Sequence, residues 1–147
     1  MRAVRTRGTA PEKQLWKILS ASKIEFRKHA RDLPGSPDIY IDRPAIAIFV
    51  HGCFWHGHPG CQRAALPKTH ARFWSTKIAS NRRRDGSAAR ALRREGLTVL
   101  TIWACQLRDV RRIRGRIEAA IRAVSGLQGR SFRRANGRRP SIVAQVL

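Results

Sequence analysis

The sequence predicts an α/β fold in which a mixed sheet is flanked by helices. Three segments carry apolar residues at helical spacing, and short apolar runs bounded by turn residues indicate strands. These segments follow one another as helix, strands, helix, strand, helix, which is the order of a layered α/β domain. A chain of 147 residues is long enough for one such domain with a core of its own. We place this domain at residues 1–124 and expect residues 125–147 to form a disordered basic tail.

The first helix is predicted over residues 11–22, after a short basic arm at residues 1–8. Thr9-Ala10-Pro11-Glu12 has the Thr-x-x-Glu pattern of a capping box, with a proline at the helix start. The apolar residues that follow, Leu15, Trp16, Ile18 and Leu19, recur at helical spacing. From these residues alone, Glu12 is interpreted as a helix cap.

A β-hairpin is predicted next. After a short strand at residues 24–29, the turn Leu33-Pro34-Gly35-Ser36-Pro37 leads into an extended segment at residues 38–41. The apolar run at residues 45–50 is short enough for a central strand. Because two strands joined by a tight turn pair antiparallel, Asp38 should lie beside the end of the second strand, at Val50-His51.

The second half of the chain predicts two helices and the clearest strand. A helix covers residues 71–95 and ends before Gly96, which has the usual role of a helix-terminating glycine. The strand at residues 97–103 should lie beside the strand at residues 45–50. The last predicted helix covers residues 109–124.

The net charge indicates a polyanionic partner. The chain has 31 Lys and Arg against 9 Asp and Glu, a formal charge of +22. Nucleic acid is the commonest polyanion, and a membrane surface is the second candidate. The sequence shows no long apolar run and no signal-like segment, so we expect a soluble cytoplasmic protein with no membrane partner.

Residues 49–61 combine several kinds of functional side chain in one loop. This segment holds two of the three cysteines and three of the five histidines. Cys53, His58 and Cys61, with Cys105 after the strand at 97–103, form a three-thiolate, one-imidazole set that is typical of structural zinc. An odd cysteine count also favours metal ligation over disulfides, and therefore a reducing compartment. The alternative is three buried free cysteines and a solvent-exposed histidine.

The same loop offers catalytic and stacking side chains. Once His58 is assigned to zinc, His51 and His56 remain, and a histidine can accept a proton from water that attacks phosphorus. Asp38 would hold a hard divalent cation through oxygen ligands. The aromatic residues Phe54, Trp55 and Trp74 are candidate wedges between DNA bases, with core packing as the alternative.

Taken together, these motifs resemble the very short patch repair endonucleases, a bacterial family that nicks DNA at T:G mismatches. The resemblance covers about residues 2–109. It rests on Thr9-Ala10-Pro11-Glu12, Leu33-Pro34-Gly35-Ser36-Pro37-Asp38, Phe49-Val50-His51-Gly52-Cys53-Phe54-Trp55-His56-Gly57-His58, Pro67-Lys68-Thr69, Phe73-Trp74, Asn81 with Asp85, and Val99 to Cys105.

The resemblance implies a restriction-endonuclease-like fold, a zinc site and a magnesium-dependent active site. Asp38 and the backbone carbonyl of Val50 would bind Mg2+. His56, oriented by Asp85, would activate the water. Glu12 and His51 would complete the catalytic set, Cys53, His58, Cys61 and Cys105 would bind Zn2+, and Phe54, Trp55, Trp74 and Lys68 would contact DNA. The implied substrate is double-stranded DNA with a T:G mismatch, cut 5′ of the thymine, and mismatch-repair proteins are further candidate partners.

Two features depart from the family pattern. His58-Pro59-Gly60-Cys61 has one residue more than the usual spacing, and the segment after Asp109 is unusually long and basic. Two alternatives therefore stay open. One is a nuclease of the same fold with another DNA target, and the other is a catalytically silent, zinc-containing DNA-binding module.

Overall fold

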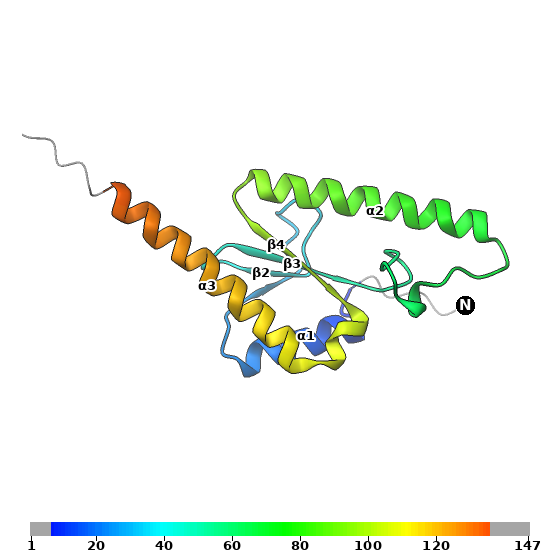
Figure 1. Ribbon diagram of the computed structural model, residues 1–147, viewed down its shortest axis with the longest axis horizontal. Helices are drawn as coiled ribbons and strands as arrows, with labels where there is room; N and C mark the ends of the chain where they lie inside the picture. The colour runs from blue at the N-terminus through cyan, green and yellow to red at the C-terminus, as the bar shows by residue number, and fades with distance from the viewer. Residues whose placement is uncertain (1–6, 136–147) are drawn as a thin grey trace, which may run out of the picture.

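The computed structural model describes residues 7–135, with side chains for residues 7–127, as a sheet between two helical layers (Figure 1). The elements are α1 (Ala10–Ala21), β1 (Arg27–Lys28), β2 (Ile39–Ile41), β3 (Ile46–His51), the short helix η1 (Gln62–Ala64), α2 (Ala71–Arg94), β4 (Thr98–Trp103), η2 (Ala104–Arg108) and α3 (Val110–Ala135). The predicted α/β class and its mixed sheet are confirmed.

The sheet has four strands in the order β1-β2-β3-β4. Strands β1 and β2 are antiparallel, as are β2 and β3, and Ile39 pairs with Ile48 across the hairpin. Strand β4 runs parallel to β3, with His51 opposite Trp103. Both predicted adjacencies, the hairpin and the β3–β4 pair, are therefore confirmed, and the ends of β3 and β4 lie at the same edge of the sheet.

The helices cover opposite faces of the sheet. Helices α1 and α3 lie together on one face, and α2 crosses the other (Figure 1). The core forms between the sheet and the α1–α3 layer, where burial of apolar side chains supplies most of the driving force for folding. Its fully or almost fully buried members are Leu15, Ile18, Leu19, Ile39, Ile41, Ile46, Ile48, Ile102, Leu107, Ile113 and Ile117.

Helix α1 begins with the predicted capping box. Glu12 donates its backbone N–H to the Thr9 hydroxyl, and the Glu12 carboxylate accepts from the Thr9 N–H and hydroxyl. The carboxylate also accepts the N–H of Gly8, at 2.9 Å. These bonds satisfy donors that a helix start otherwise leaves unpaired.

Two glycines let the loops approach α2 closely. Gly35 has a φ of +72° and lies against the methyl group of Ala88, and Gly57 has a φ of +61°. A β-carbon at Gly57 would meet the side chain of Ile78 at 2.8 Å, closer than real β-carbons come. The turn before Asp38 and the loop after β3 therefore both pack on α2, which brings them together.

Two predicted boundaries are wrong. The strand predicted at residues 24–29 is reduced to Arg27–Lys28, because only these two residues pair with β2. Helix α3 does not end at Val124 but runs to Ala135. Residues 110–139 contain no proline, and each residue added to an existing helix gains one hydrogen bond, so the helix continues to Ala135 through residues that were expected to be disordered. Residues 136–147 of the predicted tail lie outside the described residues.

None of the helices within residues 7–135 is both long and apolar enough to cross a membrane.

Candidate active site and metal centre

A cleft of about 1050 Å³ opens where β3 leaves the sheet. Its walls come from the start of α1, the residues around β1 and β2, the end of β3, the loop that follows and the middle of α2. The cleft contains the complete catalytic set predicted from the sequence: Glu12, Asp38, His51, His56 and Asp85.

Asp38 is fixed against the end of β3, as the hairpin predicted. The N–H of Val50 donates to Oδ2 of Asp38 at 2.7 Å. Burial, together with the charge of Glu12, raises the pKa of Asp38 to about 6, although the Val50 hydrogen bond and the nearby His29 and His56 act in the opposite direction. Burial disfavours the ionised form of this carboxylate, so a cation bound beside it would stabilise the negative charge.

Glu12 serves as a cap and also faces the cleft. Its side chain is almost completely buried, and its carboxylate lines the cleft together with Asp38. The sequence predicted either a cap or, through the family resemblance, a site residue. In the structure the Glu12 side chain caps α1 and also lines the cleft.

His29 is a cleft residue that the sequence did not reveal. Its Nε2 atom lies 3.7 Å from Oε2 of Glu12, and its backbone N–H donates to the Asp38 carbonyl at 2.9 Å. Glu12, His29 and Asp38 each offer a ligand atom, and these atoms lie within 4.8 Å of one another. A lone histidine next to a two-residue strand gives no motif, and the only usable signal was the pairing of its strand with the one that begins after Asp38.

His56 and Asp85 form the shortest contact between the loop and α2. Nδ1 of His56 lies 2.6 Å from Oδ2 of Asp85. Burial opposes ionisation of Asp85, but the hydrogen bond and charge of His56, with His51 and Arg84, lower the pKa of Asp85 below its usual value. When Nδ1–H donates to this carboxylate, Nε2 carries the lone pair and can accept a proton.

His51 stacks on His56 and stays neutral. The two rings are 3.9 Å apart and nearly parallel, and Nε2 of His51 lies 4.0 Å from Oδ1 of Asp85. Burial and the neighbouring His56 lower the pKa of His51 to about 4. His51 therefore holds the ring plane of His56 without adding a positive charge at neutral pH.

Of two neighbouring α2 residues, Asn81 holds the loop and Arg84 adds positive charge. The side-chain amide of Asn81 donates to the Trp55 carbonyl at 2.8 Å. Arg84 hydrogen-bonds to the Asn81 side chain and lines the cleft beside Asp85. A guanidinium at this point suits a phosphate group.

A second cluster, adjacent to the cleft, joins the predicted zinc ligands. Ligand atoms of Cys53, His58, Cys61 and Cys105 lie within 4.8 Å of one another. The sulfur of Cys105 is 3.4 Å from Nδ1 of His58, and the His58 ring stacks on Trp103 at 4.2 Å. The β3–β4 pairing brings Cys105 to the loop, as predicted.

The thiols of this cluster fit a soft cation. Burial, together with the adjacent Cys53 and Cys61 sulfurs, raises the pKa of Cys105 to about 11, so three thiolates cannot share this space unless a positive charge is present. The pKa of Cys61 is lowered, because hydrogen bonds from the Arg63 backbone and from the other cysteines outweigh the effect of burial. Three sulfurs and one imidazole nitrogen are a donor set typical of zinc.

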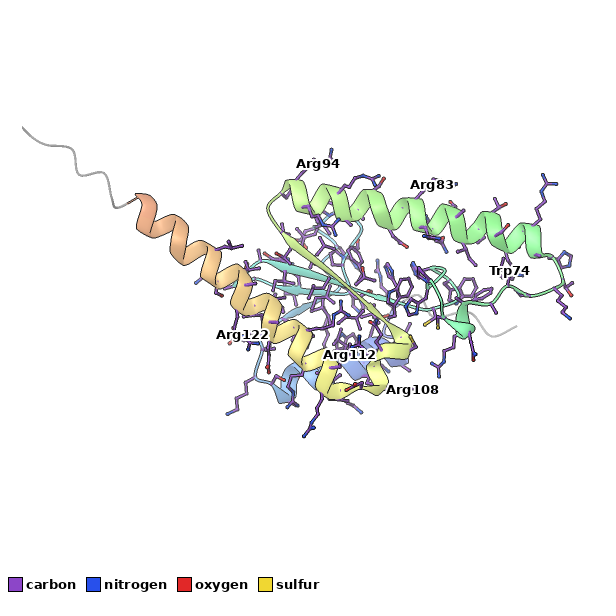
Figure 2. All side chains as sticks on the ribbon, in the orientation of Figure 1. Trp74, Arg83, Arg94, Arg108, Arg112 and Arg122 are labelled. Atoms are coloured by element: carbon purple, nitrogen blue, oxygen red, sulfur yellow. The ribbon has the colours of Figure 1, made fainter. Side chains whose placement is uncertain are left out.

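The candidate wedge residues form one aromatic cluster beside the cleft. Trp74 lies edge-on to Phe54 at 5.2 Å and to Trp55 at 5.7 Å. The cluster is not part of the core, since Trp55 is 38% exposed and the adjoining Phe73 is 61% exposed. In Figure 2, Trp74 lies on the side of α2 that faces the loop, whereas Arg83 and Arg94 lie on the opposite side. Lys68, predicted to contact DNA, is exposed in the segment before α2 and does not line the cleft.

Comparison with known proteins identifies the family. The family described as DNA mismatch endonuclease Vsr matches residues 1–63. The type II nicking enzyme V.XorIIP of Xanthomonas oryzae pv. oryzae is 44% identical over 124 residues, which cover 84% of this chain and 88% of that protein. DNA mismatch endonuclease Vsr of Escherichia coli is 43% identical over 108 residues, covering 74% of this chain and 69% of that protein. The type II nicking enzyme V.NmeAIP of Neisseria meningitidis is 32% identical over 124 residues, with coverage of 84% and 88%. The chain belongs to the Vsr family of DNA mismatch endonucleases and is a hydrolase that acts on the phosphodiester bonds of DNA.

Proposed function

We propose that the enzyme nicks one DNA strand 5′ of the thymine in a T:G mismatch, with Mg2+ as cofactor, and so initiates very short patch mismatch repair. The observation that carries this proposal is the presence in one cleft of the Asp38 carboxylate and the His56–Asp85 pair. A divalent cation and a proton acceptor at one phosphate are what phosphodiester hydrolysis requires. We also propose that the sheet and its helices form a restriction-endonuclease-like core around this cleft.

In this mechanism, side chains of the cleft orient the attacking water, and His56 receives its proton. The oxygen of water bonds to phosphorus, and the water proton moves to Nε2 of His56. The bond to the leaving oxygen breaks, and that oxygen keeps the electron pair and takes a proton from solvent water. Asp85 holds the His56 ring and stabilises the imidazolium that forms. His51 fixes the plane of the His56 ring by stacking.

Magnesium fits the oxygen side of the cleft. Asp38 and the backbone carbonyl of Val50 would hold the ion, because Mg2+ binds through one or two carboxylates and substrate phosphates. When bound, it supplies positive charge that offsets the charge of the reacting phosphate. Glu12 lies beside Asp38 and adds negative charge to the same region.

Zinc would have a structural role. Cys53, His58, Cys61 and Cys105 would supply four protein ligands, the number that structural zinc sites use, and so would leave no position for a substrate. The site would tie the loop after β3 to the residue that follows β4, and so keep His56 in place.

Mismatch recognition is assigned to the aromatic cluster. Phe54, Trp55 and Trp74 would enter the base stack beside the mismatch, where unstacking costs less than at a paired step. Lys68 and the basic α2 surface would contact phosphates, which add affinity without sequence information.

A nicking assay tests the proposal. Duplexes with a matched pair or a T:G mismatch, each labelled on one strand, are incubated with zinc-loaded enzyme and Mg2+. A single nick 5′ of the mismatched thymine supports the proposal. Cutting of both duplexes at equal rates would instead favour a nicking enzyme with another target, which the names of the relatives V.XorIIP and V.NmeAIP make the second candidate. Binding without any cutting would contradict both.

A further inference from the structure

His29 brings a nitrogen ligand to the side of the cleft where a cation is expected. Its imidazole, with the carboxylates of Glu12 and Asp38, forms a group whose potential ligand atoms lie within 4.8 Å of one another. The three residues come from the first turn of α1, the residue after β1 and the residue before β2. Neither the capping box nor the His56–Asp85 pair needs His29.

The backbone holds the His29 ring toward the carboxylates. His29 has a φ of +51°, in the left-handed region that few residues other than glycine, asparagine, aspartate and histidine adopt readily. Its N–H is fixed by the Asp38 carbonyl, and its ring lies edge-on to Trp16, with the ring centres 5.8 Å apart. The backbone hydrogen bond of His29 and the contact of its ring with Trp16 therefore both fix the position of the imidazole.

The separation of His29 from Glu12 matches two ligands of one ion. The distance of 3.7 Å between Nε2 and Oε2 is too long for a hydrogen bond. Two donors that each lie ~2.1 Å from a shared metal are ~3.0–4.2 Å apart, depending on the angle between them. One Asp38 oxygen accepts the Val50 N–H, which leaves the other oxygen available to the same ion.

In this part of the cleft Glu12 is buried and Asp38 is half-buried. The side chain of Glu12 is 4% exposed, and that of His29 is 23% exposed. Within the described residues, neither Glu12 nor Asp38 forms a salt bridge with a lysine or an arginine. Carboxylates buried together are stabilised when they pair with a cation or coordinate a metal.

We propose that Glu12, His29 and Asp38 bind one divalent ion through two carboxylates and an imidazole, and that the imidazole makes this cleft prefer Mn2+ to Mg2+. Mg2+ favours oxygen ligands, whereas imidazole nitrogen suits first-row transition metals. The inference rests on the proposed function in so far as Asp38 belongs to the metal site. It adds a ligand and a metal preference to that site.

The test is Mn2+ binding to the zinc-loaded protein without DNA. Calorimetric titration gives the affinities for Mn2+ and Mg2+, and pulsed electron paramagnetic resonance detects nitrogen bound to Mn2+. The variant is His29→Asn, because asparagine also tolerates the left-handed backbone but is too short to reach the ion. The matched control is His70→Asn, since His70 has a φ of +57°, is exposed and does not line the cleft.

The wild type and His70→Asn should show the nitrogen coupling and bind Mn2+ at least ~10-fold more tightly than Mg2+. In His29→Asn the coupling should vanish, and Mn2+ affinity should fall by ~10-fold or more while Mg2+ affinity changes little. Nitrogen coupling and Mn2+ affinity that persist in His29→Asn would overturn the inference. Because these readouts need no DNA, they are independent of the nicking assay, and a protein that binds Mn2+ through His29 but does not cut would refute only the proposed function.

Discussion

Nδ1 of His56 lies 2.6 Å from Oδ2 of Asp85, which joins the loop after β3 to the middle of α2. The contact fixes which ring nitrogen of His56 faces the cleft, and the stacked His51 fixes the plane of the ring. Two contacts, from α2 and from the end of β3, therefore hold a residue of a glycine-containing loop. This arrangement and the two proposed metal sites lead to the following predictions.

Removal of the proton acceptor should slow cutting without loss of the fold. His56→Ala should lower kcat by roughly 100- to 10,000-fold, the usual contribution of a positioned general base. Asp85→Asn should give a smaller loss, because the ring remains but its orientation and charge stabilisation are weakened. Single-turnover nicking rates measure both effects, and melting curves check that the variants fold. Wild-type rates for His56→Ala would remove His56 from the proposed mechanism.

Asp38→Asn should stabilise the protein at neutral pH in buffer without Mg2+. The pKa of Asp38 is raised to about 6, so between pH 3.8 and 6 the folded protein keeps a proton that the unfolded chain has lost. The free energy of unfolding contributed by Asp38 therefore falls as pH rises through this range. Asparagine does not ionise, so it does not lose stability as pH rises. The free energy of unfolding of the variant should therefore exceed that of the wild type by ~1–3 kcal/mol at pH 7 and should equal it below pH 3.8.

Urea unfolding of the zinc-loaded proteins at several pH values measures this difference. The pH dependence of stability that His51 contributes has the opposite sign. The pKa of His51 is lowered to about 4, so its contribution to stability is lost as pH falls from 6.5 to 4. The effect of His51 is common to the wild type and Asp38→Asn, so the difference between the two proteins isolates Asp38. A variant less stable than the wild type at pH 7 would argue against an uncompensated carboxylate.

Replacement of Cys105 should release zinc and destabilise the loop. In Cys105→Ser one thiolate of the predicted four-ligand set is lost, and metal sites of this kind contribute directly to folding. Zinc content by mass spectrometry should drop below one per chain, and the free energy of unfolding should fall by about 4 kcal/mol. Unchanged zinc content would exclude Cys105 from the ligand set.

The aromatic cluster should govern mismatch preference more than general DNA affinity. Trp74→Ala removes the ring that contacts both Phe54 and Trp55. Since stacking on a base is worth ~1–3 kcal/mol, affinity for a T:G duplex should fall by roughly 10- to 100-fold. Affinity for the matched duplex is the control and should change little. An equal loss for both duplexes would assign Trp74 to general binding.

Much of the site could be predicted because the pairing of neighbouring strands determines which residues lie close together. The turn before Asp38 and the apolar run to Val50 define a hairpin, and the Asp38–Val50 hydrogen bond follows from that hairpin. The position of Cys105 likewise follows from the parallel pairing of β3 with β4. Glu12 was predicted as a cap from its own motif, and the cap geometry is what aims it at the cleft.

The rest depended on features that leave no local pattern. The approach of Asp85 to His56 is set by how α2 lies across the sheet, so the sequence suggested it only through the family resemblance. His29 reaches the carboxylates through one left-handed residue next to a two-residue strand, which no periodicity reveals. The length of α3 was underestimated because glycine and arginine content was taken as a sign of disorder.

The measurement that tests the central claim most directly compares cutting with binding in Asp38→Ala. Single-turnover nicking of a labelled T:G duplex gives the rate, and fluorescence anisotropy of the same duplex gives the affinity. If the cleft around Asp38 and His56 is the active site, the variant should bind the duplex as tightly as the wild type, or more tightly, and should not cut it. Cutting at the wild-type rate would show that the reaction takes place elsewhere.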